Sequence, residues 1–246
     1  MGDAQRQVAL VTGAGRGIGR AIAVALARTG RHVLINYRTR RDSAEEALQQ
    51  VEAAGGTGEL LPFDVADSEA ANRAVQGVIE CHARIDILVN NAGIRSDMLM
   101  VWMKHDEWQR LLDVNLTGFF NVTQPVVKEM VLRRSGRIVS ISSTSGQSGL
   151  PGQVAYAASK AGLIGATQAL AKEVARRHVT VNAVAPGYID TEMLEGLDKE
   201  AVADKVPVGR LGTAEEVASL VVFLCSDEAS FITGGHYLVD GGYVAQ

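Results

Sequence analysis

The chain has 246 residues, of which 47% are hydrophobic and 21% charged, a composition typical of a soluble globular protein and unlike that of a disordered or fibrous one. This length suits one α/β domain with one substantial core, so we expect residues 1–246 to form a single domain. The formal net charge of −4 argues against general binding of nucleic acid, which needs a basic surface.

The N-terminal residues and the cysteines bear on the compartment and on metal sites. Met1 to Gln7 carries charged and amide side chains and no apolar signal segment, and no later apolar run reaches the roughly 18 residues of a membrane span. Cys81 and Cys225 have no second Cys or His at metal-ligand spacing. We therefore expect a cytoplasmic protein with no membrane attachment, no disulfide framework and no metal site.

Short β-branched apolar runs alternate with longer segments of helical spacing along the chain. The expected strands are Val8–Thr12, His32–Asn36, Gly58–Pro62, Ile85–Asn90, Arg137–Ser142, Thr180–Ala185 and Tyr237–Val239. The expected helices are Gly19–Thr29, Ser43–Ala54, Glu69–His82, Asp106–Arg134, Tyr156–Arg176 and Ala214–Ser226. The alternation predicts a Rossmann-type, doubly wound α/β sheet of seven parallel strands flanked by helices. Residues 188–212 interrupt the alternation of strands and helices and are expected to form a flexible lid over the strand ends.

A glycine-rich turn joins the first expected strand to the first expected helix. Glycines let the backbone approach a pyrophosphate closely, and the free N–H groups and positive dipole end of the following helix favour its negative charge. The turn therefore predicts a dinucleotide-phosphate site. Its expected contacts are Gly13, Gly15, Arg16, Gly17, Ile18 and Gly19.

The end of the second expected strand indicates which dinucleotide is bound. NAD sites usually place a carboxylate about 20 residues after the glycines, whereas the 2′-phosphate of NADP favours an Arg there. Here Arg38, Arg40 and Arg41 follow the strand, with no acid before Asp42. We expect NADPH, with Arg38 beside its 2′-phosphate; the alternative is that these arginines form a solvated surface turn.

Three residues in the second half of the chain suit carbonyl reduction. Tyr156 and Lys160 are four residues apart on an expected helix and share one face, and Ser143 lies thirteen residues before Tyr156. Reducing a ketone puts negative charge on its oxygen, so one group must donate a proton and another must hold the oxygen. A nearby ammonium would lower the pKa of a tyrosine enough for this role. Taken singly, each residue also suits an ordinary structural role.

Together these motifs resemble the short-chain dehydrogenase/reductase family, through T-G-x-x-x-G-x-G in the glycine turn and S-x12-Y-x3-K ending at Lys160. The resemblance covers nearly everything from Val8 to Tyr243. It implies a fourth catalytic residue, Asn115, which kinks a helix and supports a water that relays protons to Lys160. It also implies cofactor contacts from Arg16 at the 2′-phosphate and from Asp64, Val65, Asn91, Ala92, Gly93, Tyr156, Lys160, Pro186, Gly187, Ile189 and Thr191.

Within that family, the segments 156–163, 180–187 and 234–242 most resemble β-ketoacyl-acyl-carrier-protein reductases. This resemblance implies NADPH-dependent reduction of a 3-oxoacyl thioester in fatty-acid, polyketide or polyene synthesis. It also implies a homotetramer and docking of an acyl carrier protein at Lys128 and Arg177. A reductase of a free small-molecule ketone remains open, and a non-catalytic dinucleotide sensor is disfavoured by the complete proton-relay set.

A group of bulky apolar residues follows the Asn90-Asn91-Ala92-Gly93 turn. Its members are Met98, Met100, Trp102, Met103 and Trp108. They could shape a pocket for an acyl chain, or they could belong to the helix core or to a subunit interface.

Overall fold

The computed structural model describes residues 6–244, and its centre is one sheet of seven parallel strands in the order β3-β2-β1-β4-β5-β6-β7. The strands are β1 (Val8–Val11), β2 (His32–Tyr37), β3 (Thr57–Pro62), β4 (Ile87–Asn90), β5 (Gly136–Ile141), β6 (Val179–Pro186) and β7 (His236–Val239). The central strands are buried along their length, as expected for a parallel sheet covered on both faces. The predicted doubly wound fold is confirmed.

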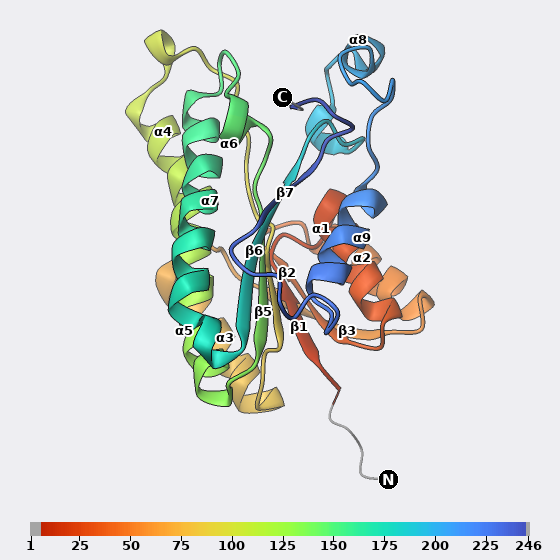
Figure 1. Ribbon diagram of the computed structural model, residues 1–246, viewed down its shortest axis with the longest axis vertical. Helices are drawn as coiled ribbons and strands as arrows, with labels where there is room; N and C mark the ends of the chain where they lie inside the picture. Colours follow the sequence, from red (N-terminus) through yellow and green to blue (C-terminus); the bar gives the residue numbers. More distant parts are fainter. Residues whose placement is uncertain (1–5, 245–246) are drawn as a thin grey trace.

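Helices cover both faces of this sheet (Figure 1). One face is packed by α1 (Gly17–Arg28), α2 (Arg41–Ala53) and α9 (Ala214–Leu224), and the other by α3 (Ser68–His82), α5 (Gly118–Arg133) and α7 (Val154–Val174). The shorter helical segments are η1 (Met100–Trp102), α4 (His105–Leu112), η2 (Asp113–Thr117), α6 (Ser145–Ser148), η3 (Ala175–Arg177), η4 (Glu192–Leu194) and α8 (Lys199–Ala203). Two apolar clusters result, one on each side of the sheet. No helix within residues 6–244 has both the length and the apolar character needed to cross a membrane.

The expected single helix over Asp106–Arg134 is divided into α4 and α5 by one π-helical turn, η2. The side chain of Asn115 explains the break, because it bonds outside its own helix. Its Oδ1 accepts from Ile94 N at 2.8 Å, and its Nδ2 donates to Ile94 O at 2.9 Å and to Ser159 Oγ at 3.1 Å. A π turn of this kind typically marks a functional position in a helix.

The irregular segment 188–212 is a loop closed at its base by backbone hydrogen bonds. Gly212 N donates to Tyr188 O at 2.9 Å, and Asp190 N donates to Gly212 O at 2.8 Å. Between these ends the chain forms η4 and α8. The loop rises beside the carboxyl ends of the strands, at the upper right of Figure 1. The base of the loop is therefore fixed just beyond the carboxyl ends of the strands, while α8, at the tip of the loop, lies away from the sheet.

Candidate active site

A cavity of about 670 Å³ lies at the carboxyl ends of the strands. The strand order reverses beside β1, where β2 and β4 flank it on opposite sides, and this is where ligands bind in open α/β sheets. Every residue expected at the site lines the cavity except Gly15 and Asn115. Gly15 instead packs against α2, since a Cβ on it would lie 3.4 Å from Ala44 N. Asn115 lies behind the cavity, in the bonds to Ile94 described above.

The glycine loop packs tightly on the turn after β4. Gly13 has a φ of +62°, and a Cβ on Gly19 would lie 2.4 Å from Asn91 Nδ2, so neither position accepts a larger residue without displacement. Asn91 Nδ2 donates to Thr12 O at 2.9 Å and to Gly13 O at 3.1 Å. Asn91 therefore holds the loop in place as well as lining the cavity.

The N-terminus of α1 faces this cavity through Gly17, Ile18 and Gly19. Its first turn contains no acidic residue, and no side chain caps its N–H groups. Unsatisfied N–H groups and the positive dipole end of a helix together suit a pyrophosphate. The residues present here therefore fit a dinucleotide.

Asn36, at the end of β2, also supports the glycine loop and was not singled out from the sequence. Its buried side chain accepts from Gly13 N at 3.1 Å and donates to Leu61 O and Phe63 O, each at 3.1 Å. It links the loop to β3 across the sheet. An Asn inside an apolar strand was the available signal, because a buried amide must find hydrogen-bond partners.

The two arginines expected at the 2′-phosphate, Arg16 and Arg38, line the cavity but are paired with carboxylates, as is the neighbouring Arg40. Arg16 Nη1 bonds Glu192 Oε2 at 2.5 Å, Arg40 Nη1 lies 3.2 Å from the same oxygen, and Arg38 Nη1 lies 3.3 Å from Asp64 Oδ2. The Arg16 hydrogen bond is the main cause that lowers the pKa of Glu192. The sequence did not reveal this competition, because Glu192 is far from Arg16 along the chain.

Asp64 and Val65, expected at the adenine, lie just after β3 and line the cavity. Asp64 Oδ1 accepts from Ala66 N at 2.9 Å, which fixes the turn. Val65 is buried, and its carbonyl oxygen accepts from Asn121 Nδ2 at 2.9 Å. Both positions are thus held rigidly from α5 and from their own turn.

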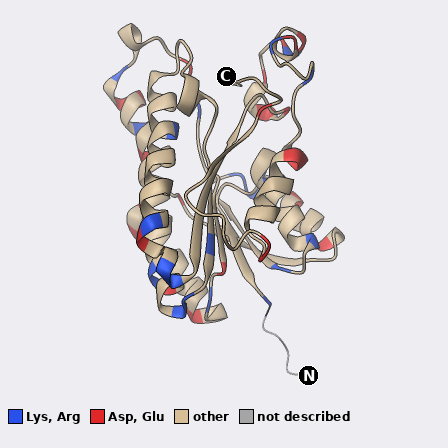
Figure 2. Cartoon of the chain, in the orientation of Figure 1, with Lys and Arg blue, Asp and Glu red and all other residues tan. Residues whose placement is uncertain are grey.

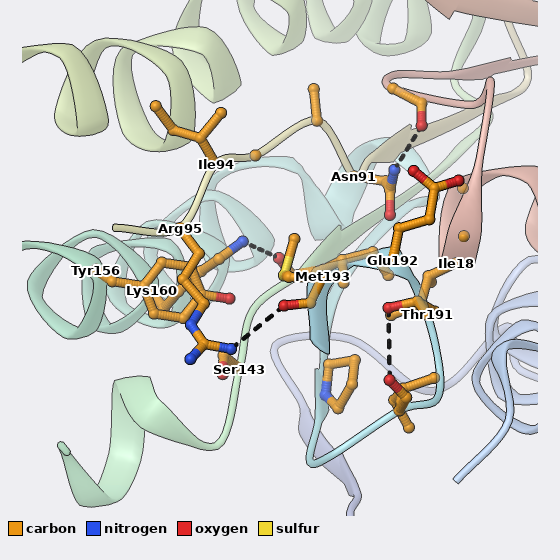
Figure 3. A pocket seen from close by; sticks show the side chains of 18 of the residues that line it. Ile18, Asn91, Ile94, Arg95, Ser143, Tyr156, Lys160, Thr191, Glu192 and Met193 are labelled. Atoms are coloured by element: carbon orange, nitrogen blue, oxygen red, sulfur yellow. Dashed lines mark hydrogen bonds between the residues drawn. The ribbon is translucent and has the colours of Figure 1, made fainter. Parts of the chain in front are cut away.

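Ser143, Tyr156 and Lys160 meet at the opposite end of the cavity, as Figure 3 shows. Ser143 follows β5, and the other two project from the first half of α7. All three are buried. Lys160 Nζ donates to Ile141 O at 2.8 Å and lies 5.6 Å from the centroid of the Tyr156 ring. The fold thus brings together the residues that the sequence spacing predicted.

Burial governs the protonation of this group. It raises the pKa of Tyr156, against the smaller lowering effects of the hydrogen bond with Ser143 and the charge of Arg95. Burial also lowers the pKa of Lys160 to about 8. The net pKa of Tyr156 is therefore raised and not lowered as expected, because the cost of burying a phenolate exceeds these two effects. Tyr156 is held as a protonated phenol, the form that can donate a proton.

A chain of polar side chains beside Tyr156 was not expected from the sequence. Arg95 is paired with Asp97, whose Oδ1 accepts from Gln153 Nε2 at 2.8 Å; Gln153 Oε1 in turn accepts from Ser145 Oγ at 2.9 Å. Arg95 Nη1 also reaches Met193 O in the 188–212 loop, at 3.5 Å (Figure 3). This chain connects the catalytic end of the cavity to the loop.

The apolar part of the cavity wall differs from the expected cluster. None of the five Met and Trp residues lines the cavity, whereas Leu150 and the loop residues Met193, Leu194 and Leu197 do. Met103 and Trp108 pack behind Tyr156 instead, and the side chain of Trp102 is 70% exposed. Met103 and Trp108 therefore support the catalytic helix, Met100 and Trp102 face solvent, and the loop supplies part of the apolar cavity wall.

Comparisons with known proteins agree with this geometry. A family model described as enoyl-(acyl carrier protein) reductase matches residues 13–244. The 3-oxoacyl-[acyl-carrier-protein] reductase of Synechocystis sp. is 47% identical over 239 residues, 97% of each chain. The 3-oxoacyl-[acyl-carrier-protein] reductase FabG of Thermotoga maritima is 45% identical, over 97% of this chain and 98% of its own. The enzyme of the same name from Staphylococcus aureus is 43% identical, over 95% of this chain and 96% of its own. The chain belongs to the short-chain dehydrogenase/reductase family.

Proposed function

We propose that this protein reduces a 3-oxoacyl thioester carried by an acyl carrier protein to the 3-hydroxyacyl thioester, with NADPH as the reductant. The observation that carries the proposal is the meeting of Ser143, Tyr156 and Lys160 at one end of a cavity whose other end suits a dinucleotide. The names of the relatives, 3-oxoacyl-[acyl-carrier-protein] reductases at 43–47% identity, support the substrate class.

The residues at the catalytic end divide the proton chemistry among them. NADPH, when bound, supplies the hydride that reaches the carbonyl carbon of the substrate. Tyr156 donates its phenolic proton to the carbonyl oxygen, and Ser143 donates a hydrogen bond to the same oxygen. The charge of Lys160 stabilises the phenolate that remains. Asn115 positions the backbone at Ile94 and supports the water through which Lys160 is reprotonated.

The remaining cavity residues hold the cofactor in this proposal. Gly17, Ile18 and Gly19 bind the pyrophosphate. The adenosine half lies against Asp64, Val65, Asn91, Ala92 and Gly93, and the nicotinamide lies against Pro186, Gly187, Ile189 and Thr191. Arg16 and Arg38 bind the 2′-phosphate, which is the reason for expecting NADPH rather than NADH.

Glu192 competes with the 2′-phosphate for Arg16. We expect Glu192→Gln to lower the Kd for NADPH by about two- to fivefold, because the phosphate no longer displaces a carboxylate and exposed ion pairs contribute little each. The Kd for NADH, which lacks this phosphate, serves as the internal control and should stay the same. Fluorescence titration measures both constants. Equal changes for the two cofactors, or weaker NADPH binding, would show that Glu192 does not compete at this position.

We propose that residues 1–246 act as a single domain in which the 188–212 loop is a lid. The contacts of Arg16 and Arg40 with Glu192, and of Arg95 with Met193, join η4, in the first part of the loop, to residues around the cavity. A lid so placed excludes water from the reacting carbonyl and supplies the apolar wall for the acyl chain.

Docking of the carrier is proposed at Lys128 and Arg177. Both side chains are exposed. Lys128 lies in the second half of α5 and Arg177 at the end of η3, directly after α7, where Lys and Arg gather in Figure 2. A basic surface complements an acidic carrier. These helix ends lie at the edge of the sheet away from the cavity, so the docking proposal requires the carrier to deliver its acyl group to the cavity of another subunit.

We also propose a homotetramer in the cytoplasm. Exposed apolar side chains on α5, on α7 and before β7 support self-association: Phe120, Leu132, Val154 and Phe231. Such residues are costly to leave in water across several elements of one molecule. A tetramer also provides the neighbouring subunit that the docking proposal needs.

The proposed activity is tested by following NADPH oxidation with a short 3-oxoacyl thioester, supplied as the acyl-carrier-protein conjugate and as the free N-acetylcysteamine thioester. We expect higher kcat/KM for the conjugate, little activity with NADH, and no oxidation with the matching 2-enoyl conjugate. The enoyl conjugate is included because the matching family model carries that name. Lys128→Ala and Arg177→Ala should then remove the preference for the conjugate without changing turnover of the free thioester.

Other outcomes distinguish the alternatives. Equal turnover of both thioester forms would contradict the proposed recognition of the carrier but support the proposed ketoreductase activity. Activity only with free ketones would move the function to a small-molecule substrate. NADPH binding with no turnover of any carbonyl compound would favour the alternative of a non-catalytic dinucleotide sensor.

A further inference from the structure

Two histidines and a glutamate meet at the opposite edge of the sheet from the active site. His32 is the first residue of β2, Glu59 lies in the first half of β3, and His82 is the last residue of α3. This edge, where the strands begin, lies at the bottom of Figure 1. The three residues are far apart in sequence, and only the packing of α3 on the β2–β3 pair brings them together.

One carboxylate oxygen lies near both imidazoles. Glu59 Oε1 lies 2.8 Å from His82 Nε2 and 3.9 Å from His32 Nε2, and one potential ligand atom from each residue lies within 4.8 Å of the others. The two rings are 5.1 Å apart between centroids. A tetrahedral zinc ion with ligand bonds of about 2.0–2.1 Å separates its ligand atoms by roughly 3.3 Å, between the two distances seen here. Small side-chain rotations therefore suffice to form such a site.

The surroundings of His32 orient its ring for this role. His32 Nδ1 is hydrogen bonded to Thr57 Oγ1 at 2.9 Å, and Thr57 Oγ1 also accepts from Arg6 Nη1 at 2.8 Å. Metal-binding histidines are commonly held in this way through the ring nitrogen that does not bind the ion. His32 Nε2, which points toward Glu59, is buried and has no hydrogen-bond partner within residues 6–244. A buried ring nitrogen without a partner is unfavourable unless something else satisfies it.

We infer that His32, Glu59 and His82 form a binding site for one divalent transition-metal ion of the zinc type. Two imidazoles and one carboxylate suit Zn²⁺, whereas Mg²⁺ and Ca²⁺ prefer oxygen ligands alone. The side chain of Glu59 is 47% exposed, so water can take the fourth position. The ion would join β2, β3 and α3 at the start of the sheet, away from Tyr156, and its role is structural.

Equilibrium binding of Zn²⁺ to the purified full chain tests this inference, by competition with a chromophoric chelator at neutral pH. We expect one ion per chain and a Tm higher by about 5–10 °C at a free Zn²⁺ concentration about 100 times Kd. His82→Gln and Glu59→Gln should each weaken binding by at least about 100-fold, and Thr57→Val by about 10- to 100-fold. Reductase turnover, measured in the same preparations, should be unchanged and shows that each variant is folded.

His105→Gln is the matched control, because His105 begins α4 outside this cluster and should leave Zn²⁺ affinity as in the unmodified chain. Absence of stoichiometric binding at micromolar Zn²⁺ would overturn the inference and leave an ordinary hydrogen-bonded cluster. Wild-type affinity in both His82→Gln and Glu59→Gln would also overturn it, by moving the bound ion elsewhere. The assay does not depend on NADPH or on the thioester, so its failure leaves the proposed reductase function standing.

Discussion

Tyr156→Phe should lower kcat by about 10²- to 10⁴-fold while the Kd for NADPH changes little, because only the proton donor to the carbonyl oxygen is lost. The phenyl ring keeps the buried packing of Tyr156 against Leu111 and Ala155. Single-turnover reduction of the 3-oxoacyl thioester measures the chemical step, and a fluorescence titration measures cofactor binding. The two measurements together distinguish the loss of the proton donor from a general disruption of the active site.

The matched control is Tyr237→Phe, which removes a hydroxyl from β7 outside the cavity lining. It should turn over at close to the wild-type rate. A Tyr156→Phe enzyme with near wild-type kcat would remove Tyr156 from the reaction and shift the proton donor to another group at that end of the cavity.

Lys160→Met should lower kcat by about 10²- to 10³-fold, because the phenolate of Tyr156 loses its stabilising charge. The same substitution should change how stability depends on pH. Burial lowers the pKa of Lys160 from 10.5 to about 8, so between these values the unfolded chain binds more protons than the folded one. The wild-type free energy of unfolding should therefore rise with pH across this window, by about 3 kcal/mol relative to Lys160→Met.

Urea unfolding of both proteins at a series of pH values measures this difference. Cys225 also contributes to the pH dependence, because burial raises the pKa of its thiol to about 12. Above the usual pKa of a thiol this shift lowers the free energy of unfolding as the pH rises, which opposes the effect of Lys160. Cys225 is present in both proteins, so subtraction removes its contribution. Parallel stability curves for wild type and Lys160→Met would mean that the ammonium is not destabilised by burial.

The parts of the site that could be predicted from the sequence are those set by local order along the chain. The glycine turn lies between a strand and a helix. Tyr156 and Lys160 share one face of their helix whatever that helix packs against. The seven strands followed from apolar runs of the right length. Each of these depends on neighbours within a few residues, so the sequence alone carries the information.

Features that depend on contacts between distant segments could not be predicted in this way. Glu192 reaches Arg16 only because the loop folds back to the N-terminus of α1, and Met193 reaches Arg95 because the same loop passes the segment after β4. The π turn at Asn115 depends on the backbone of Ile94. The cluster of His32, Glu59 and His82 depends on the packing of α3 on β2 and β3, so the spacing of Cys and His along the chain did not indicate it.

The closed base of the 188–212 loop makes this part of the chain exchangeable. Because backbone hydrogen bonds between Tyr188, Asp190 and Gly212 fix both ends, a longer or shorter tip leaves the sheet and the glycine turn in place. Each doubling of loop length costs only about 0.6 kcal/mol in closure entropy. Exchanging the loop residues beyond η4, such as Leu197 in the cavity wall, is therefore a direct route to changing the acyl-chain preference of the proposed reaction while Thr191 and Glu192 stay in place.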